Sequence, residues 1–88
     1  MKIKSGFLLR TIAGSSIVVP VGSRSREFNG MITLNGTGAF LWQRLEQGAS
    51  EEELVAALLE NYSDVDEDRA RRSVEGFLRR LREIDCLE

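Results

Sequence analysis

The sequence predicts an α+β fold of winged-helix-like architecture, in which a three-stranded antiparallel sheet is followed by three helices. The first third of the chain is rich in β-branched and aromatic residues, interrupted by clusters of turn-forming residues. The remainder contains three stretches with helical periodicity, each preceded by a side chain suited to helix capping. A length of 88 residues is enough for one small core, so we expect a single domain over residues 1–88.

The first two strands are predicted at residues 7–12 and 17–21, which are both rich in strand-forming side chains. Gly14, Ser15 and Ser16 lie between them and indicate the turn of a β-hairpin. Pro20 has no N–H to donate, so we expect it near a strand end or facing solvent.

A third strand is predicted at residues 28–34, entered through Asn29 and Gly30. Asn-Gly is also the strongest two-residue hairpin signal. A hairpin that pairs residues 24–28 with residues 31–34 therefore stays open as an alternative.

Capping residues mark where each helix is expected to begin. Asn35 is suited to accept an N–H of a first helical turn, and Gly48 to end that helix. Ser50 opens a capping box with the glutamate three residues later. Asp66 is expected to cap the third helix, which ends near Ile84.

Helical spacing also predicts which side chains are buried. The expected core residues are Gly38, Leu41, Trp42 and Leu45 in the first helix, Leu54, Val55, Leu58, Leu59 and Tyr62 in the second, and Ala70, Val74, Phe77, Leu78 and Leu81 in the third. We expect Leu87 to fold back on this core and Cys86 to be an incidental buried or half-buried thiol.

The composition argues against catalysis. The chain has no histidine and one cysteine, which removes the commonest general base and the ligands of a thiolate metal cluster. No phosphate-binding glycine motif and no nucleophile elbow occurs. We therefore expect a binding protein and not an enzyme. No apolar run is long enough for a membrane span and no secretory signal is present, so we expect a cytoplasmic protein without membrane contact.

Charge is unevenly distributed along the chain. Residues 1–26 carry five basic residues and no acid, residues 27–68 carry one base and ten acids, and residues 69–88 carry six arginines and four acids. A winged-helix nucleic-acid binder is one alternative, although the net charge of −2 does not favour it. A regulatory dimer that pairs strand edges between two copies is another.

The stretch from Phe28 to Trp42, FNGMITLNGTGAFLW, resembles the signature of the PqqD-like family. Leu45, the segment ELVAALL at residues 53–59, Tyr62 and the sequence VDE at residues 65–67 extend the resemblance. The similarity continues through the last predicted helix to Leu87-Glu88 and covers nearly the whole chain.

This resemblance implies a peptide chaperone that recognises precursors of ribosomally made, post-translationally modified peptides. The partners it implies are the leader segment of a precursor peptide and a modifying enzyme, often a radical S-adenosylmethionine enzyme. The leader is bound as an added strand beside the third strand, in a groove against the third helix. No cofactor is implied for the recognition domain, and no nucleic acid; a homodimer is compatible with it.

The residues themselves allow this role, because an uncovered strand edge can accept an extended peptide by β-augmentation. Gly76 is unusual within a helix, and a gap there would let a peptide approach a basic strip of arginines. The alternatives are that these arginines only face solvent and that the glycine makes room for the sheet. The predicted peptide-binding residues are Phe28, Asn29, Gly30, Met31, Ile32, Thr33 and Leu34 in the strand, and Arg69, Arg72, Ser73, Gly76, Phe77 and Arg80 in the helix. Proline at Ile32 is expected to remove an edge donor and abolish binding.

Overall fold

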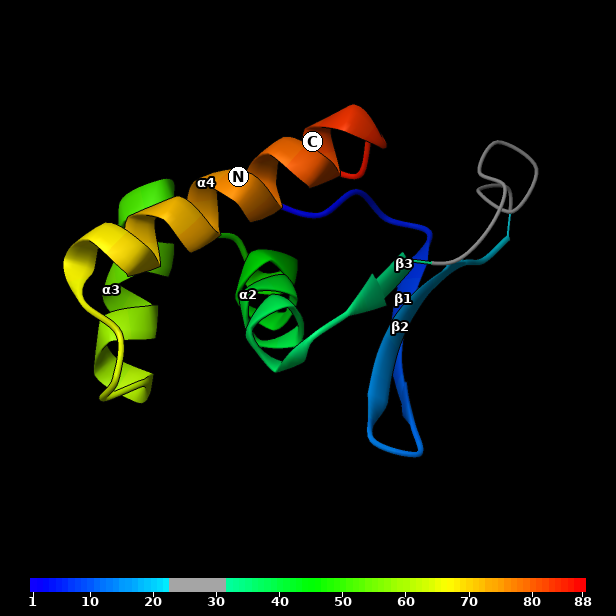
Figure 1. The fold of residues 1–88 in the computed structure, drawn as a ribbon. Helices are drawn as coiled ribbons and strands as arrows, with labels where there is room; N and C mark the ends of the chain where they lie inside the picture. Colours follow the sequence, from blue (N-terminus) through cyan, green and yellow to red (C-terminus); the bar gives the residue numbers. More distant parts are fainter. Residues whose placement is uncertain (23–31) are drawn as a thin grey trace.

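The computed structural model describes residues 1–22 and 32–88, and it contains a three-stranded antiparallel sheet followed by three helices (Figure 1). This confirms the predicted α+β fold. The strands are β1 (Phe7–Ile12), β2 (Ser15–Pro20) and β3 (Ile32–Leu34), in the sheet order β1-β2-β3. The helices are α2 (Gly36–Gln47), α3 (Glu51–Asn61) and α4 (Glu67–Glu83).

Four predicted site residues, Phe28, Asn29, Gly30 and Met31, lie outside the described residues. The same holds for the alternative hairpin of residues 24–28 and 31–34. The third strand is therefore described only from Ile32 to Leu34.

The β1–β2 turn is tighter than predicted. Ile12 pairs with Ser15, so the connection is the two residues Ala13 and Gly14, and Ser15 and Ser16 belong to β2. Both connecting residues have positive φ, 51° and 81°. Two successive positive φ values are typical of the hairpin turn whose twist matches the flanking strands. The sequence did not reveal this because alanine seldom adopts such a φ. Pro20 is the last residue of β2, as expected.

The predicted caps are confirmed at all three helix N-termini. The Asn35 side chain accepts the Gly38 N–H at 2.7 Å, and the Asp66 carboxylate accepts the Arg69 N–H at 2.8 Å. Gly48 ends α2 with a φ of 96°, and Ile84 is the C-cap of α4. These local bonds explain why the helix boundaries were predictable from the sequence.

Ser50→Ala is expected to lower the free energy of unfolding by about 1 kcal/mol, because it removes half of the capping box. The Ser50 hydroxyl accepts the Glu53 N–H at 3.1 Å, and the Glu53 carboxylate accepts the Ser50 N–H at 2.9 Å. Urea unfolding measures the loss, with Ser50→Asp as the control that keeps an acceptor at the cap. Equal midpoints for wild type and Ser50→Ala would contradict this role of the cap.

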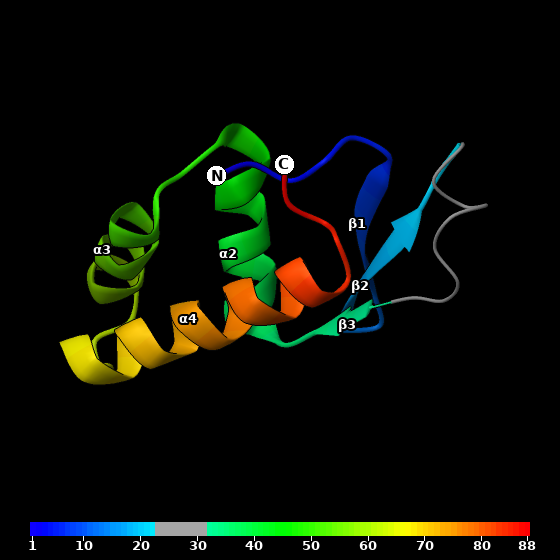
Figure 2. The same ribbon diagram turned by 90° about the horizontal axis from the view of Figure 1, so that it is seen from above.

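α2 lies between α3 and the sheet, and α4 runs across both α3 and α2 toward the sheet (Figures 1 and 2). The core fills the space between them. Its buried side chains are Val18, Ile32 and Leu34 from the sheet, Leu41, Trp42 and Leu45 from α2, Leu54, Val55 and Leu58 from α3, and Ala70, Val74, Leu78 and Leu81 from α4. No described helix is long and apolar enough to cross a lipid bilayer.

Four side chains of the helices differ from the predicted core. Leu59 is 39% exposed and Ala57 is buried in its place, because α3 turns the Ala57 side toward the other elements. Phe77 and Tyr62 are half-buried and pack at the edge of the core. The predicted Cys86 burial is confirmed.

The two ends of the chain lie side by side. Ile3 forms a β-bridge with Leu87, and the Glu88 N–H donates to the Lys2 carbonyl oxygen at 2.9 Å. Leu87 therefore folds back on the core, as expected, and Ile3 joins the core although it belongs to no periodic apolar pattern. Figure 2 shows both ends close together, beside the end of α2 that leads into α3.

Candidate functional site

One hydrogen bond just past the end of β2 shows toward which neighbouring strand each main-chain N–H and C=O group of β2 points. The Val21 N–H donates to the Gly6 carbonyl oxygen at 2.8 Å, which continues the β1–β2 ladder. In an antiparallel ladder, successive residues point their N–H and C=O groups alternately to the two sides. The main-chain N–H and C=O groups of the odd-numbered residues of β2 therefore point toward β1. Those of Ser16 and Val18 point toward β3.

The free edge of β3 follows from this alternation. Ser16 pairs with Leu34 and Val18 with Ile32, so the main-chain groups of Ile32 and Leu34 are directed into the sheet. Thr33 is then the residue of described β3 whose N–H and C=O point away from β2. β3 is the outermost of the described strands, so Thr33 offers a donor and an acceptor at an edge that no described strand covers.

The predicted effect of proline at Ile32 needs correction. The Ile32 N–H faces β2, not the edge, and the side chain is buried in the core. Proline there would disrupt the β2–β3 pairing and the core together. Thr33 is the position at which an edge donor can be removed while the sheet is kept.

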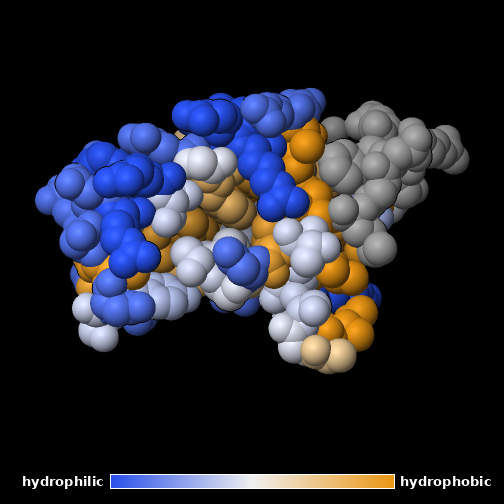
Figure 3. Space-filling view, in the orientation of Figure 1, coloured by the Kyte–Doolittle hydropathy of each residue, from blue (hydrophilic) through white to orange (hydrophobic). Residues whose placement is uncertain are grey.

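A groove of about 560 Å³ runs between this edge and α4. In Figure 3 apolar surface is visible between the charged side chains along the top of the molecule and the strands beside them. The groove is lined by Thr33 and Leu34 of β3, Asn35 and the α2 residues Thr37, Gly38 and Leu41, and the α4 residues Arg72, Ser73, Gly76, Phe77 and Arg80.

The structure brings seven of the predicted site residues to this groove. They are Thr33, Leu34, Arg72, Ser73, Gly76, Phe77 and Arg80. Ile32 belongs to the same strand with its side chain in the core, and Arg69 is exposed and not among the described lining residues. The roles of all these residues in binding stay predictions.

Sequence reasoning missed the α2 side of the groove. Asn35, Thr37 and Gly38 form its base together with Leu41, because the first turn of α2 follows directly after β3. A Cβ at Gly38 would lie 3.3 Å from the Leu34 Cβ and 3.2 Å from the Asn35 Oδ1. Gly38 thus permits the close approach of the strand end and the helix, a requirement that no periodic pattern signals.

Gly76 faces open space. A Cβ built there meets no described atom within 4 Å outside the helix's own backbone, and its φ is not one that only glycine favours. The alternative that Gly76 makes room for the sheet is therefore not supported. The space beside Gly76 belongs to the groove.

The arginines of α4 fall into groups with different surroundings. Arg71 donates to both carboxylate oxygens of Glu52, at 2.7 and 3.3 Å, and contacts Glu67 at 3.4 Å. The hydrogen bond from Arg71 lowers the pKa of Glu52 below its usual range. The Arg71–Glu52 contribution to stability is therefore present above the ordinary carboxyl pKa, and it is lost as the pH falls through the lowered value.

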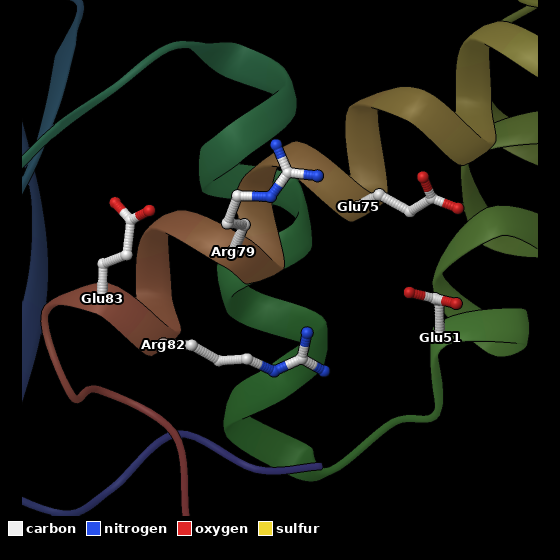
Figure 4. Close-up of a pocket in the computed structure, with 5 residues that line it drawn as sticks. All are labelled: Glu51, Glu75, Arg79, Arg82 and Glu83. Atoms are coloured by element: carbon white, nitrogen blue, oxygen red, sulfur yellow. The ribbon is translucent and has the colours of Figure 1, made fainter.

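A second hollow, of about 430 Å³, lies on another side of α4. It is lined by Glu51, Glu75, Arg79, Arg82 and Glu83. Figure 4 shows the side chains of Glu51 and Glu75 across this space from those of Arg79 and Arg82. Acids and bases are thus mixed in this hollow, whereas the described lining of the groove at β3 contains arginines and no acid.

The chain's own end does not fill the groove. The C-terminal segment pairs with the N-terminal one through Ile3 and Leu87, and neither segment contributes to the described groove lining. Within residues 1–22 and 32–88, no strand pairs with the outer edge of β3 at Thr33.

The comparisons with known proteins agree with this geometry. The sequence matches the family described as "Coenzyme PQQ synthesis protein D (PqqD)" over residues 9–87. No curated protein matches it. The structure described as "TbiB1 in Complex with the TbiA(beta) Leader Peptide" is 27% identical, with a TM-score of 0.78, over 100% of this chain and 95% of that chain.

A second solved structure, "Lasso peptide synthetase B1 complexed with the leader peptide", shares the fold. It is 21% identical, with a TM-score of 0.72, over 93% of this chain and 89% of that chain. Because the family match spans nearly all of the sequence, this chain belongs to the PqqD family.

Proposed function

We propose that this protein binds the leader segment of a ribosomally made precursor peptide and presents it to a modifying enzyme. The leader adds as a further strand at β3 and lies in the groove against α4. The protein itself performs no catalysis; the chemistry belongs to the partner, for which a radical S-adenosylmethionine enzyme is one type. The whole described chain acts as one recognition domain.

The observation that carries this proposal is the open edge at Thr33 beside a groove. Main-chain pairing at Thr33 supplies affinity for an extended peptide regardless of its sequence, and the groove supplies contacts for alternate side chains. Similarity to TbiB1, whose structure contains a leader peptide, supports the same kind of ligand here. Phe28, Asn29, Gly30 and Met31, which precede described β3, are proposed to extend the docking edge.

A nucleic-acid-binding role has less support. Phosphate binding needs a continuous basic face. Here the arginines of α4 are divided, since Arg71 is paired with acids and Arg79 and Arg82 share their hollow with three glutamates. The apolar side chains Leu41 and Phe77 in the groove suit a peptide better than a phosphate backbone.

Titration of the ¹⁵N-labelled protein with a synthetic leader peptide, taken from a precursor encoded beside its gene, tests the proposal. We expect the largest backbone amide shifts at residues 29–34 and 69–80, because these amides flank the bound strand. A low-salt gel shift with duplex DNA and RNA serves as the comparison for the nucleic-acid alternative.

Shifts concentrated on β1, with no change at Thr33 or Gly76, would show that the leader docks elsewhere. Light scattering with and without the peptide tests the alternative that two copies pair through their strand edges. If the protein is a dimer that dissociates when peptide is added, the two copies and the peptide compete for one edge.

A further inference from the structure

The groove side of α4 presents two arginines at a regular distance from a glycine. Arg72, Gly76 and Arg80 follow one another at four-residue intervals and all line the groove, so they lie in one row along the helix. Neither Arg72 nor Arg80 has an ion-pair partner among the described residues, in contrast to Arg71. The groove therefore presents two positive charges, one on each side of the space at Gly76.

The spacing of these charges matches an extended chain. Eight residues of helix separate Arg72 from Arg80, a rise of about 12 Å at 1.5 Å per residue. Four residues of a β-strand span about 13 Å at 3.3 Å per residue. Residues i, i+2 and i+4 of a strand also share one face. Three side chains on one face of an added strand thus match Arg72, Gly76 and Arg80 in turn.

The helix and the strand are suitably oriented for this match. In Figures 1 and 2 the part of α4 nearest the sheet and β3 run alongside each other, with opposite chain directions. A strand paired to β3 at Thr33 is parallel or antiparallel to β3, so its axis follows α4 as well. Its alternate side chains then face α4.

We propose that the preferred ligand is an extended segment of the pattern acid–x–apolar–x–acid. This inference rests on the proposed function and specifies the ligand of the same site. The two carboxylates pair with Arg72 and Arg80, and the central apolar side chain enters the space at Gly76, against Leu41 and Phe77. The residues at the two x positions face away from α4, so their side chains are not selected.

Of the two described hollows on α4, the groove at β3 is the one whose charges favour an acidic ligand. The described groove lining carries two arginines and no acid, whereas the other hollow on α4 carries three glutamates with its two arginines. An acidic peptide is attracted to the first and meets like charges at the second. The same groove disfavours a segment with lysine or arginine at the two outer positions.

Selection from a random nonapeptide display library against the full-length protein tests the inference. We expect enriched sequences to carry Asp or Glu at i and i+4 with an apolar residue at i+2. The double variant Arg72→Glu, Arg80→Glu is expected to select Lys or Arg at the same two positions. The double variant Arg79→Glu, Arg82→Glu is the matched control, with the same change in charge on another side of α4, and it should keep the acidic preference.

A pair of synthetic peptides of equal charge measures how strongly the affinity depends on the spacing of the two acids. Moving one Glu from i+4 to i+3 places it on the opposite face of the strand, and we expect about fivefold weaker binding, the size of one exposed ion pair. Equal affinities for the two peptides would overturn the spacing.

The outcomes separate the inference from the function on which it rests. Selected peptides that shift the Thr33 and Gly76 amides but show no acidic enrichment overturn the ligand pattern and leave peptide binding intact. Selected peptides that shift neither amide overturn the proposed docking site itself.

Discussion

Thr33→Pro is expected to weaken leader-peptide binding by at least about tenfold while the helices stay formed. Proline removes the N–H that Thr33 directs to the open edge, and it leaves a carbonyl of the bound peptide without its donor. An unsatisfied group of this kind costs about 1–3 kcal/mol, and 1.4 kcal/mol corresponds to a factor of ten in affinity. Fluorescence anisotropy with a labelled leader peptide measures the loss, and far-UV circular dichroism reports the helices.

The matched control is Thr33→Val, which keeps the N–H and the β-branched shape. It should bind within about twofold of wild type, since the main-chain donor is unchanged and exposed substitutions have small effects. The edge assignment at β3 is wrong if the proline variant is folded and binds as tightly as the valine variant.

Gly76→Leu is expected to reduce peptide affinity by more than about tenfold and at the same time to stabilise the fold. The leucine side chain would occupy the open space beside Gly76 and exclude the peptide side chain from it. Removing a glycine from the interior of α4 raises helix stability by about 0.5–1 kcal/mol. Binding and thermal unfolding therefore change in opposite directions, which a merely misfolded variant cannot produce.

Two further variants sharpen this test. Gly76→Ala should give most of the gain in stability with a smaller loss of affinity, because one methyl group fills less of the space. Ala56→Leu enlarges an exposed side chain on α3, outside the described groove lining, and should leave affinity unchanged. If Gly76→Leu binds the peptide as wild type does, the groove at α4 is not part of the binding surface.

The helices could be predicted closely because their signals are local. Asn35, Ser50 and Asp66 each bond to an amide three residues later, so the sequence itself marks the helix starts. The predicted hairpin turn lay one or two residues too far along the chain, because Ala13 adopts a positive φ that alanine seldom has. Ile3 was missed for another reason: its burial depends on Leu87, a partner at the far end of the chain.

The candidate site likewise contains residues whose placement the sequence predicts and residues whose placement depends on packing. Arg72, Gly76 and Arg80 were predictable because helical spacing puts them in one row. The base of the groove was not, since Thr37 and Gly38 reach it only through the packing of α2 against the end of β3. The direction of each strand amide likewise depends on the register of the β1–β2 hairpin, and it moves the edge donor from Ile32 to Thr33.

The meeting of the two chain ends has a practical consequence for tethering. The Glu88 amide lies 2.9 Å from the Lys2 carbonyl oxygen, and neither end borders the groove. A fluorescent reporter or a maturase can thus be fused through a flexible linker at the amino or the carboxyl terminus and start from nearly the same point. In a maturase fusion at either terminus, the bound peptide is held within reach of the attached enzyme, and a short flexible linker raises their effective concentration to about 1 mM or above.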